Sequence, residues 1–187
     1  MATNVTGTQN VIDAAIECKV SKSIFISTDK AVNPVNTYGT SKALAEKLWL
    51  NGNKYAADDL ITFSVCRYGN VVGSAGSVVP CWRKLIEQGA EYLPVTDERM
   101  TRFWFKMDDV MRFVADSLER MQGGELFIPR LPSIRITDLA EAMGMPYRVV
   151  GIRPGEKIHE EMEPGYDSGT NEWFLTVEQI KETIGAI

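Results

Sequence analysis

The chain has 187 residues, 44% of them hydrophobic and 24% charged, which suits one soluble domain, or one domain with a small lobe, around an ordinary core. Its net charge of -5 and its pI near 5.0 argue against a nucleic acid or an anionic membrane as the main partner. A local basic pocket for a diphosphate stays compatible with this balance, because net charge does not describe a single cleft.

Cysteine, histidine and hydropathy patterns narrow the class further. Cys18, Cys66 and Cys81 have no paired spacing, so we expect them to be buried and reduced. His159 is the single histidine, so no metal site is expected, and a structural role is favoured for it over a catalytic one. No apolar run reaches the roughly 18 residues of a membrane span, and the start lacks the regions of a signal peptide. We therefore expect a soluble, cytoplasmic chain without a membrane partner.

Residues 1–20 are predicted to form an amphipathic helix. Its apolar face would consist of Val5, Val11, Ile12, Ala15 and Ile16. Asn4 is expected to act structurally, as a helix cap or in a strand-to-helix hydrogen bond.

A strand, a polar loop and a helix come next. Ser23–Ile26 has strand character, residues 27–37 form a polar loop with a proline, and residues 38–50 have helical spacing. Ligands of open α/β sheets bind in this position, at the carboxyl ends of strands. The loop is therefore the first candidate for a site.

Tyr38 and Lys42 lie four residues apart, which places them on one face of a helix. A phenol is a weak base because its ordinary pKa is about 10, but a neighbouring ammonium favours the phenolate. The pair could thus remove a proton from a sugar hydroxyl. The alternative is a surface tyrosine above a solvated lysine, and Asp29 with Lys30 could likewise be a surface ion pair of little energetic value.

The remaining elements follow from apolar runs, glycines and prolines. They are a buried strand at Leu60–Cys66, a helix at Cys81–Gln88, a loop at Pro94–Met100, a helix at Asp108–Met121 stopped by Gly123 and Gly124, a strand at Glu125–Pro129, a helix at Thr137–Met143 capped by Thr137, and a helix at Val177–Ile184. The aromatic residues at positions 103–105 are expected in the core rather than stacked on a base.

Residues 27–42 resemble the catalytic segment of extended short-chain dehydrogenase/reductases. More narrowly, Asp29-Lys30 followed by Ala-Val-Asn-Pro is similar to the inverting UDP-N-acetylglucosamine 4,6-dehydratases. Three later blocks are similar to the same family: Arg-Tyr-Gly-Asn-Val at 67–71, Thr-Arg-Phe at 101–103, and Arg-Pro-Gly-Glu-Lys-x-His-Glu at 153–160. The resemblance implies an α/β fold, with a partial Rossmann-like parallel sheet with helices and a small C-terminal substrate-binding lobe. Residues 1–128 would form the Rossmann-like part, with 73–102 contributing to the substrate site, and 129–187 the lobe.

The resemblance also implies a site and a reaction. Catalytic residues would be Thr28, Asp29, Lys30, Tyr38 and Lys42; Ser27, Tyr38 and Lys42 would bind NADP or NAD; and Asn70, Ser77, Arg102, Arg153 and Glu156 would bind a UDP-sugar. Tyr38 would deprotonate the carbon 4 hydroxyl as hydride leaves, and Asp29 with Lys30 would eliminate water across carbons 5 and 6. Hydride would then return to carbon 6, which makes the enzyme a lyase.

Each substrate residue also has a structural interpretation. Asn70 could occupy a left-handed glycine turn, Ser77 could merely cap a helix, and Arg153 with Glu156 could be solvated charges beside a Pro-Gly turn.

No Gly-rich dinucleotide turn, G-x-G-x-x-G or G-x-x-G-x-x-G, occurs in the sequence. We therefore expect the cofactor-binding half to be missing and the strand at 23–26 to be an exposed sheet edge. Three alternatives stay open: a simple epimerase, which needs no Asp-Lys pair; a non-catalytic nucleotide-sugar-binding or assembly subunit; and half of a split enzyme. The partner would be a complementing N-terminal chain or further copies in a homo-oligomer.

Overall fold

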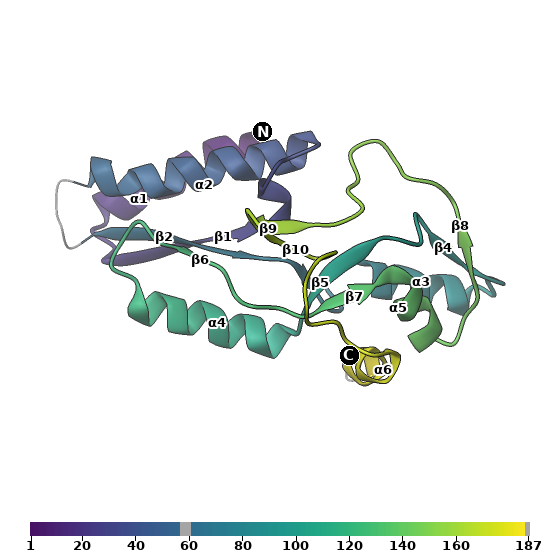
Figure 1. The fold of residues 1–187 in the computed structure, drawn as a ribbon. Coiled ribbons are helices and arrows are strands. Elements are labelled where there is room, and N and C mark those ends of the chain that lie inside the picture. Colours follow the sequence, from purple (N-terminus) through teal and green to yellow (C-terminus); the bar gives the residue numbers. More distant parts are fainter. Residues whose placement is uncertain (57–60, 186–187) are drawn as a thin grey trace. The chain divides into compact units, whose positions relative to one another are not determined.

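The computed structural model describes residues 1–56 and 61–185 (Figure 1). It divides into two compact units, one of Met1–Tyr68 and Met111–Pro129, the other of Gly69–Val110 and Arg130–Ile187. Residues 69–110 thus group with the C-terminal residues, whereas the functional division at residue 128 stays a prediction. Within the described ranges, no helix has the length and hydropathy that crossing a membrane requires.

The first unit contains a parallel sheet in the order β1-β2-β6, formed by Lys22–Thr28, Thr62–Tyr68 and Leu126–Phe127. β1 and β2 are in register from Lys22 opposite Thr62 to Thr28 opposite Tyr68. β2 is central and almost wholly buried, as its apolar run predicts, although the expected first residue, Leu60, lies outside the described residues. Among the described strands β1 is an edge, which confirms that prediction.

Helices cover both faces of this sheet (Figure 1). A π-helical turn (η1, Ala2–Thr6), α1 (Gly7–Glu17) and α2 (Thr37–Tyr55) lie on one face; α4 (Met107–Arg120) covers the other from Met111 onward. Ile12 and Ala15 are buried against Trp49 and Phe63, whose rings meet edge to face at 5.4 Å. Val11 is 54% exposed, so its place on the apolar face was wrong.

Asn4 has a structural contact, but not the predicted one. Its side-chain amide donates to the hydroxyl of Ser41 at 3.0 Å and therefore links η1 to α2. It is neither a helix cap nor a strand-to-helix bond, because the residue preceding α1 is Thr6.

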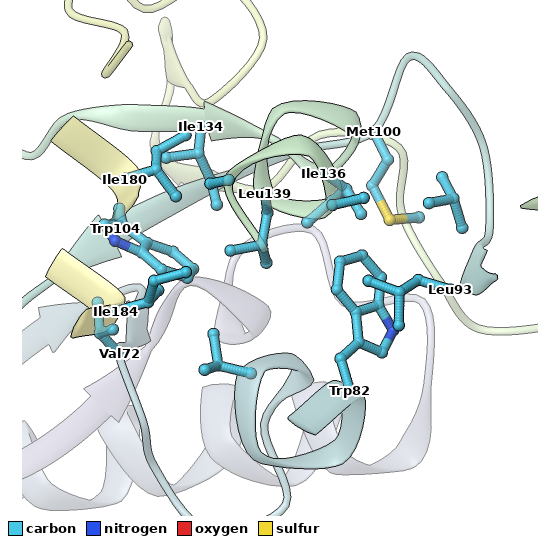
Figure 2. Close-up of a cluster of buried hydrophobic side chains, with 14 residues drawn as sticks. Val72, Trp82, Leu93, Met100, Trp104, Ile134, Ile136, Leu139, Ile180 and Ile184 are labelled. Atoms are coloured by element: carbon cyan, nitrogen blue, oxygen red, sulfur yellow. The ribbon is translucent and has the colours of Figure 1, made fainter. Parts of the chain in front are cut away.

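The second unit is built on β5 (Thr101–Phe105), which pairs parallel with β3 (Asn70–Val71) and antiparallel with β7 (Ser133–Arg135). Residues 103–105 are buried, as predicted. Around β5, Trp104 packs with side chains of α3 (Val78–Glu87), α5 (Ile136–Ala142) and α6 (Val177–Gly185) in one cluster (Figure 2). β4 (Leu93–Val95) pairs with β8 (Tyr147–Val149), and β9 (Glu161–Glu163) with β10 (Tyr166–Asp167).

Three further sequence predictions were wrong. Pro94 lies inside β4, because pairing with β8 outweighs its loop preference. Thr137 does not cap α5, which already begins at Ile136. Of the cysteines only Cys66 is buried: Cys18 ends α1 and Cys81 lies beside the inward-facing Val79 and Trp82 of α3, so both thiols are exposed.

Candidate active site

The turn after β1 buries a carboxylate. Thr28 ends the strand, and Asp29, Lys30 and Ala31 form a single 3-10 turn, η2. Oδ1 of Asp29 accepts from the Thr28 hydroxyl at 2.8 Å and from the Lys30 ammonium at 3.0 Å. Asp29 is 0% exposed. The alternative of a surface ion pair is therefore wrong, because a buried carboxylate depends strongly on its partners.

Several predicted site residues have buried oxygens without a hydrogen-bond partner among the described residues. They are Oδ2 of Asp29 and Oγ of Ser27 in the first unit, and Oδ1 of Asn70 and Oγ of Ser77 in the second. Such atoms are rare in folded proteins, and each costs about 1–3 kcal/mol. All four atoms belong to residues that the sequence also selected as candidate site residues, and their ligand contacts stay a prediction.

The start of α2 approaches this turn closely. The side chain of Asn36 caps the helix by accepting the Gly39 N–H at 2.9 Å. A Cβ on Gly39 would lie 2.3 Å from the Lys30 carbonyl oxygen and 2.9 Å from Cβ of Pro34, so only glycine fits there. These two residues were missed, although a glycine inside a helical pattern costs about 1 kcal/mol and so signals a packing reason.

Tyr38 and Lys42 lie one helical turn apart on α2. Tyr38 is 51% exposed, and the described residues record no hydrogen bond to its hydroxyl. The Lys42 ammonium donates to the Ile26 carbonyl at 2.7 Å and lies 4.0 Å from the centroid of the Phe25 ring. Burial lowers the pKa of Lys42, and the Glu46 carboxylate partly opposes this. The alternative of a solvated lysine is therefore wrong.

The two structural interpretations of Asn70 and Ser77 are also wrong. Asn70 lies in β3, where it pairs with Trp104 of β5, and its φ is not positive. Ser77 precedes α3, but its hydroxyl makes no capping hydrogen bond. Neither side chain is explained by local structure.

Arg102 lies against the stretch 157–160 and so joins two of the sequence blocks. Its guanidinium donates to the carbonyls of Thr101, Ile158 and Lys157 at 2.7, 3.0 and 3.0 Å, and its Nε lies 4.0 Å from the Glu160 carboxylate. These contacts give Arg102 a structural role, and its phosphate contact stays a prediction.

Arg153 and Glu156 form the expected turn around Pro154 and Gly155. The Glu156 N–H donates to the Arg153 carbonyl at 3.1 Å, and the Arg153 N–H to the Glu156 carboxylate at 3.4 Å. The Arg153 side chain is exposed and the Glu156 side chain half-buried. The turn is thus real, and it leaves an arginine facing solvent.

His159 has the structural contact that the sequence favoured. Its Nδ1 is hydrogen-bonded to the Thr101 hydroxyl at 2.8 Å, and a Cβ on Gly169 would come within 2.6 Å of that nitrogen. Within residues 1–56 and 61–185, no group of three acidic, cysteine or histidine side chains could hold a metal ion.

The parallel sheet, with helices on both faces and a polar turn at a strand end, defines a Rossmann-like α/β protein. Residues 1–181 match the family described as "Polysaccharide biosynthesis protein", and the chain belongs to that family. It is 54% identical over 168 residues to the UDP-N-acetylglucosamine 4,6-dehydratase (inverting) of Campylobacter jejuni subsp. jejuni serotype O:2, a match that covers 89% of this chain and 50% of the relative. The chain thus spans about half the length of the curated relatives it matches, and the resemblance to the dehydratases is confirmed.

Solved structures agree on the fold. Pen from Bacillus thuringiensis superimposes with a TM-score of 0.89 at 30% identity, over 98% of this chain and 67% of that chain. DesIV from Streptomyces venezuelae, a dTDP-glucose 4,6-dehydratase with NAD and TYD bound, gives a TM-score of 0.79 at 19% identity, over 98% and 65% of the two chains. The α/β fold predicted from the sequence is confirmed.

Proposed function

We propose that this chain carries the substrate chemistry of a nucleotide-sugar 4,6-dehydratase of surface-polysaccharide synthesis, which converts UDP-N-acetylglucosamine into a 4-keto-6-deoxy sugar. One observation carries the proposal: the buried Asp29 binds Lys30 and Thr28 through one oxygen, while its other oxygen has no partner in the described chain. A simple epimerase has no use for this pair. The 54% identity to an inverting dehydratase supports the same choice.

Residues at the end of β1 and in the first turns of α2 fit a nicotinamide dinucleotide. Ser27 offers a buried hydroxyl that has no partner among the described residues, Tyr38 an exposed phenol and Lys42 an ammonium whose present acceptor is a backbone carbonyl. These three residues would hold NADP or NAD. When bound, the dinucleotide accepts a hydride from the sugar and returns it.

Tyr38 takes the proton of the carbon 4 hydroxyl, as its exposed position allows. Thr28 donates a hydrogen bond near the carbon 4 oxygen; its hydroxyl now bonds Asp29 and needs only to rotate. The resulting ketone acidifies the proton on carbon 5.

Asp29 and Lys30 then act as one proton-carrying pair. Transfer of a proton across the 3.0 Å contact between Nζ and Oδ1 turns the ion pair into a neutral amine and a carboxylic acid. The amine takes the proton from carbon 5, and the acid protonates the hydroxyl on carbon 6, which leaves as water. Protons balance, because the pair gives one and receives one.

The second unit supplies the nucleotide-sugar contacts in this proposal. Asn70 and Ser77 present oxygens that are buried and unpartnered in the described chain, which suits sugar hydroxyls or a phosphate oxygen. Arg153 faces solvent and can pair with the diphosphate, and Glu156 can accept a hydrogen bond from the nucleoside or the sugar. Arg102 would add a phosphate contact to its structural role.

Mass spectrometry of the nucleotide sugar, after incubation with UDP-N-acetylglucosamine and NADP or NAD, tests the proposal. One arm uses the chain alone; the other adds a separately expressed polypeptide with a Gly-rich dinucleotide turn. Loss of one water in either arm supports the dehydratase, and loss only in the second supports a split enzyme. An unchanged sugar in both arms overturns catalysis and favours a binding subunit. Gel filtration of both mixtures distinguishes a homo-oligomer from a complex of the two chains.

A further inference from the structure

Helix α2 carries a third charged residue on the face of Tyr38 and Lys42. Glu46 follows Lys42 by four residues, as Lys42 follows Tyr38, so the three side chains lie along one stripe of the helix. Glu46 is only 6% exposed. A glutamate is almost never buried to this extent without a partner, so its position needs an explanation beyond a solvated helix surface.

The partner of Glu46 is Arg67, near the end of β2. Nε and Nη2 of the guanidinium donate to the two carboxylate oxygens at 2.9 and 2.5 Å, in a bidentate arrangement. The Arg67 side chain is itself only 12% exposed. Arg67 stands three residues before Asn70 in the chain, so the pair fixes α2 to the strand that leads into the predicted substrate loop.

Burial has the largest influence on the pKa of Lys42 and lowers it, and the Glu46 carboxylate opposes this shift. β1 offers it only uncharged groups, the Ile26 carbonyl and the Phe25 ring. In η2, Asp29 is already paired with Lys30. On α2 the charge that acts on Lys42 is that of Glu46, and on β2 the charged group is Arg67, which contacts Glu46. Glu46 thus contacts Arg67 directly and follows Lys42 by one helical turn, so its carboxylate is the negative charge on α2 that Arg67 can moderate.

We propose that Glu46 is a positioning residue of the active site, whose carboxylate, held by Arg67 one helical turn beyond Lys42, keeps the Lys42 ammonium charged beside Tyr38. Arg67 moderates this effect, because it holds both carboxylate oxygens. This inference rests on the proposed function for the role of Lys42, but the interaction itself can be measured without turnover.

The test is a pH titration of the Lys42 side-chain resonances by NMR in the full chain with labelled lysine. Glu46→Gln keeps the size and one acceptor but removes the charge, so the pKa of Lys42 should fall below its wild-type value. Arg67→Gln frees the carboxylate, so the same pKa should rise. Asp13→Asn, which removes a charge from an exposed position on α1, should leave it unchanged.

If the Glu46–Arg67 pair only holds the structure together, the pKa of Lys42 should shift in the same direction, or not at all, in Glu46→Gln and Arg67→Gln, because either substitution breaks the pair. That result overturns the proposal. If Arg67→Gln does not fold, Glu46→Gln and the neutral double variant Glu46→Gln/Arg67→Gln decide: the single variant must lower the pKa of Lys42 and the double variant must restore it toward wild type. A failed dehydratase assay with these shifts intact would overturn the proposed function and leave this inference standing.

Discussion

Two buried polar clusters, one in each unit, differ in how their hydrogen bonds are used. In the turn after β1, Ser27 and Asp29 each keep a buried oxygen without a partner in the described chain. In the second unit, the Thr101 hydroxyl is instead hydrogen-bonded to both His159 and Ser168, each at 2.8 Å. The Ser168 hydroxyl also accepts the Glu160 N–H at 2.9 Å. An unpaired buried group destabilises the fold and a paired one stabilises it. The second cluster therefore stabilises the fold, whereas the first is the one that we propose to bind the ligand.

The largest expected effect follows from the first cluster. Asp29→Asn or Lys30→Ala should reduce dehydratase turnover by roughly 10²–10⁴-fold, because each removes one half of the proposed acid–base pair. Thermal unfolding should show that the folded state persists. Asp97→Asn is the matched control, since Asp97 also pairs with a cation nearby in the chain, Arg99 at 2.8 Å, but is not one of the proposed catalytic or binding residues. Wild-type turnover in Asp29→Asn would contradict the comparison.

The second cluster predicts a loss of stability. Arg102→Met removes a guanidinium that pairs with three carbonyls and faces the buried Glu160, so the free energy of unfolding should fall by about 3–5 kcal/mol. Arg153→Met, at an exposed position, should change it by no more than about 0.5 kcal/mol. Urea denaturation measures both. If both substitutions lowered the free energy of unfolding equally, Arg102 would not differ from Arg153 in stabilising the fold, and the comparison would fail.

Gly39 tests whether the first cluster depends on the close packing of α2 against η2. Gly39→Ala should lower the free energy of unfolding by about 1–3 kcal/mol, because the new Cβ would collide with the Lys30 carbonyl oxygen and with Cβ of Pro34. Gly185→Ala in α6 meets no atom within 4 Å and should be neutral or slightly stabilising. Denaturation curves of the two variants that coincide would refute the close approach of α2 to η2.

The smallest effect concerns a paired carboxylate in the first unit. Burial would raise the pKa of Glu125, but hydrogen bonds from Ser64, Gln122 and Gly123 outweigh it and lower the pKa below its ordinary 4.5. Glu125 therefore stabilises the fold above pH 4.5, and this contribution disappears as the pH falls through the folded-state pKa.

Glu125→Gln should accordingly cost about 0.5–1 kcal/mol at neutral pH, since the carboxylate is partly exposed and screened. Urea denaturation at several pH values should show the gap to wild type narrowing below pH 4.5. A gap that is constant with pH would mean that the carboxylate charge is irrelevant.

Long periodic segments could be predicted from the sequence. The expected cores of β1, α2, β2 and α4 were confirmed, because ten or more residues of pattern, or an unbroken apolar run, outweigh local ambiguity. The shorter α6 was confirmed as well. The pairs β4–β8 and β9–β10 were not predicted, since two or three residues show no alternation and pairing depends on distant segments. Pro94, which lies in β4, even favoured a loop in the sequence analysis.

The candidate site could be named from the sequence, but its physical state could not. The sequence motifs selected Asp29, Asn70 and Ser77. Only the structure shows that the carboxylate is buried and that oxygens of these residues have no hydrogen-bond partner in residues 1–56 and 61–185. Neither Asn36 nor Gly39 was selected, because capping and close approach depend on which backbone lies opposite. Burial and hydrogen-bond pairing arise from tertiary contacts that a pattern of spacing does not contain.

The most direct measurement is the reaction of UDP-N-acetylglucosamine in D₂O, with the cofactor and, where needed, the complementing chain. If Asp29 and Lys30 eliminate water, carbon 5 loses its proton and regains one from solvent, so the 4-keto-6-deoxy product should carry deuterium at carbon 5. Mass spectrometry and NMR detect the label and its position. A product that has the same mass as the substrate, with no water lost and no deuterium at carbon 5, would contradict the account. It would identify the chain as part of an epimerase.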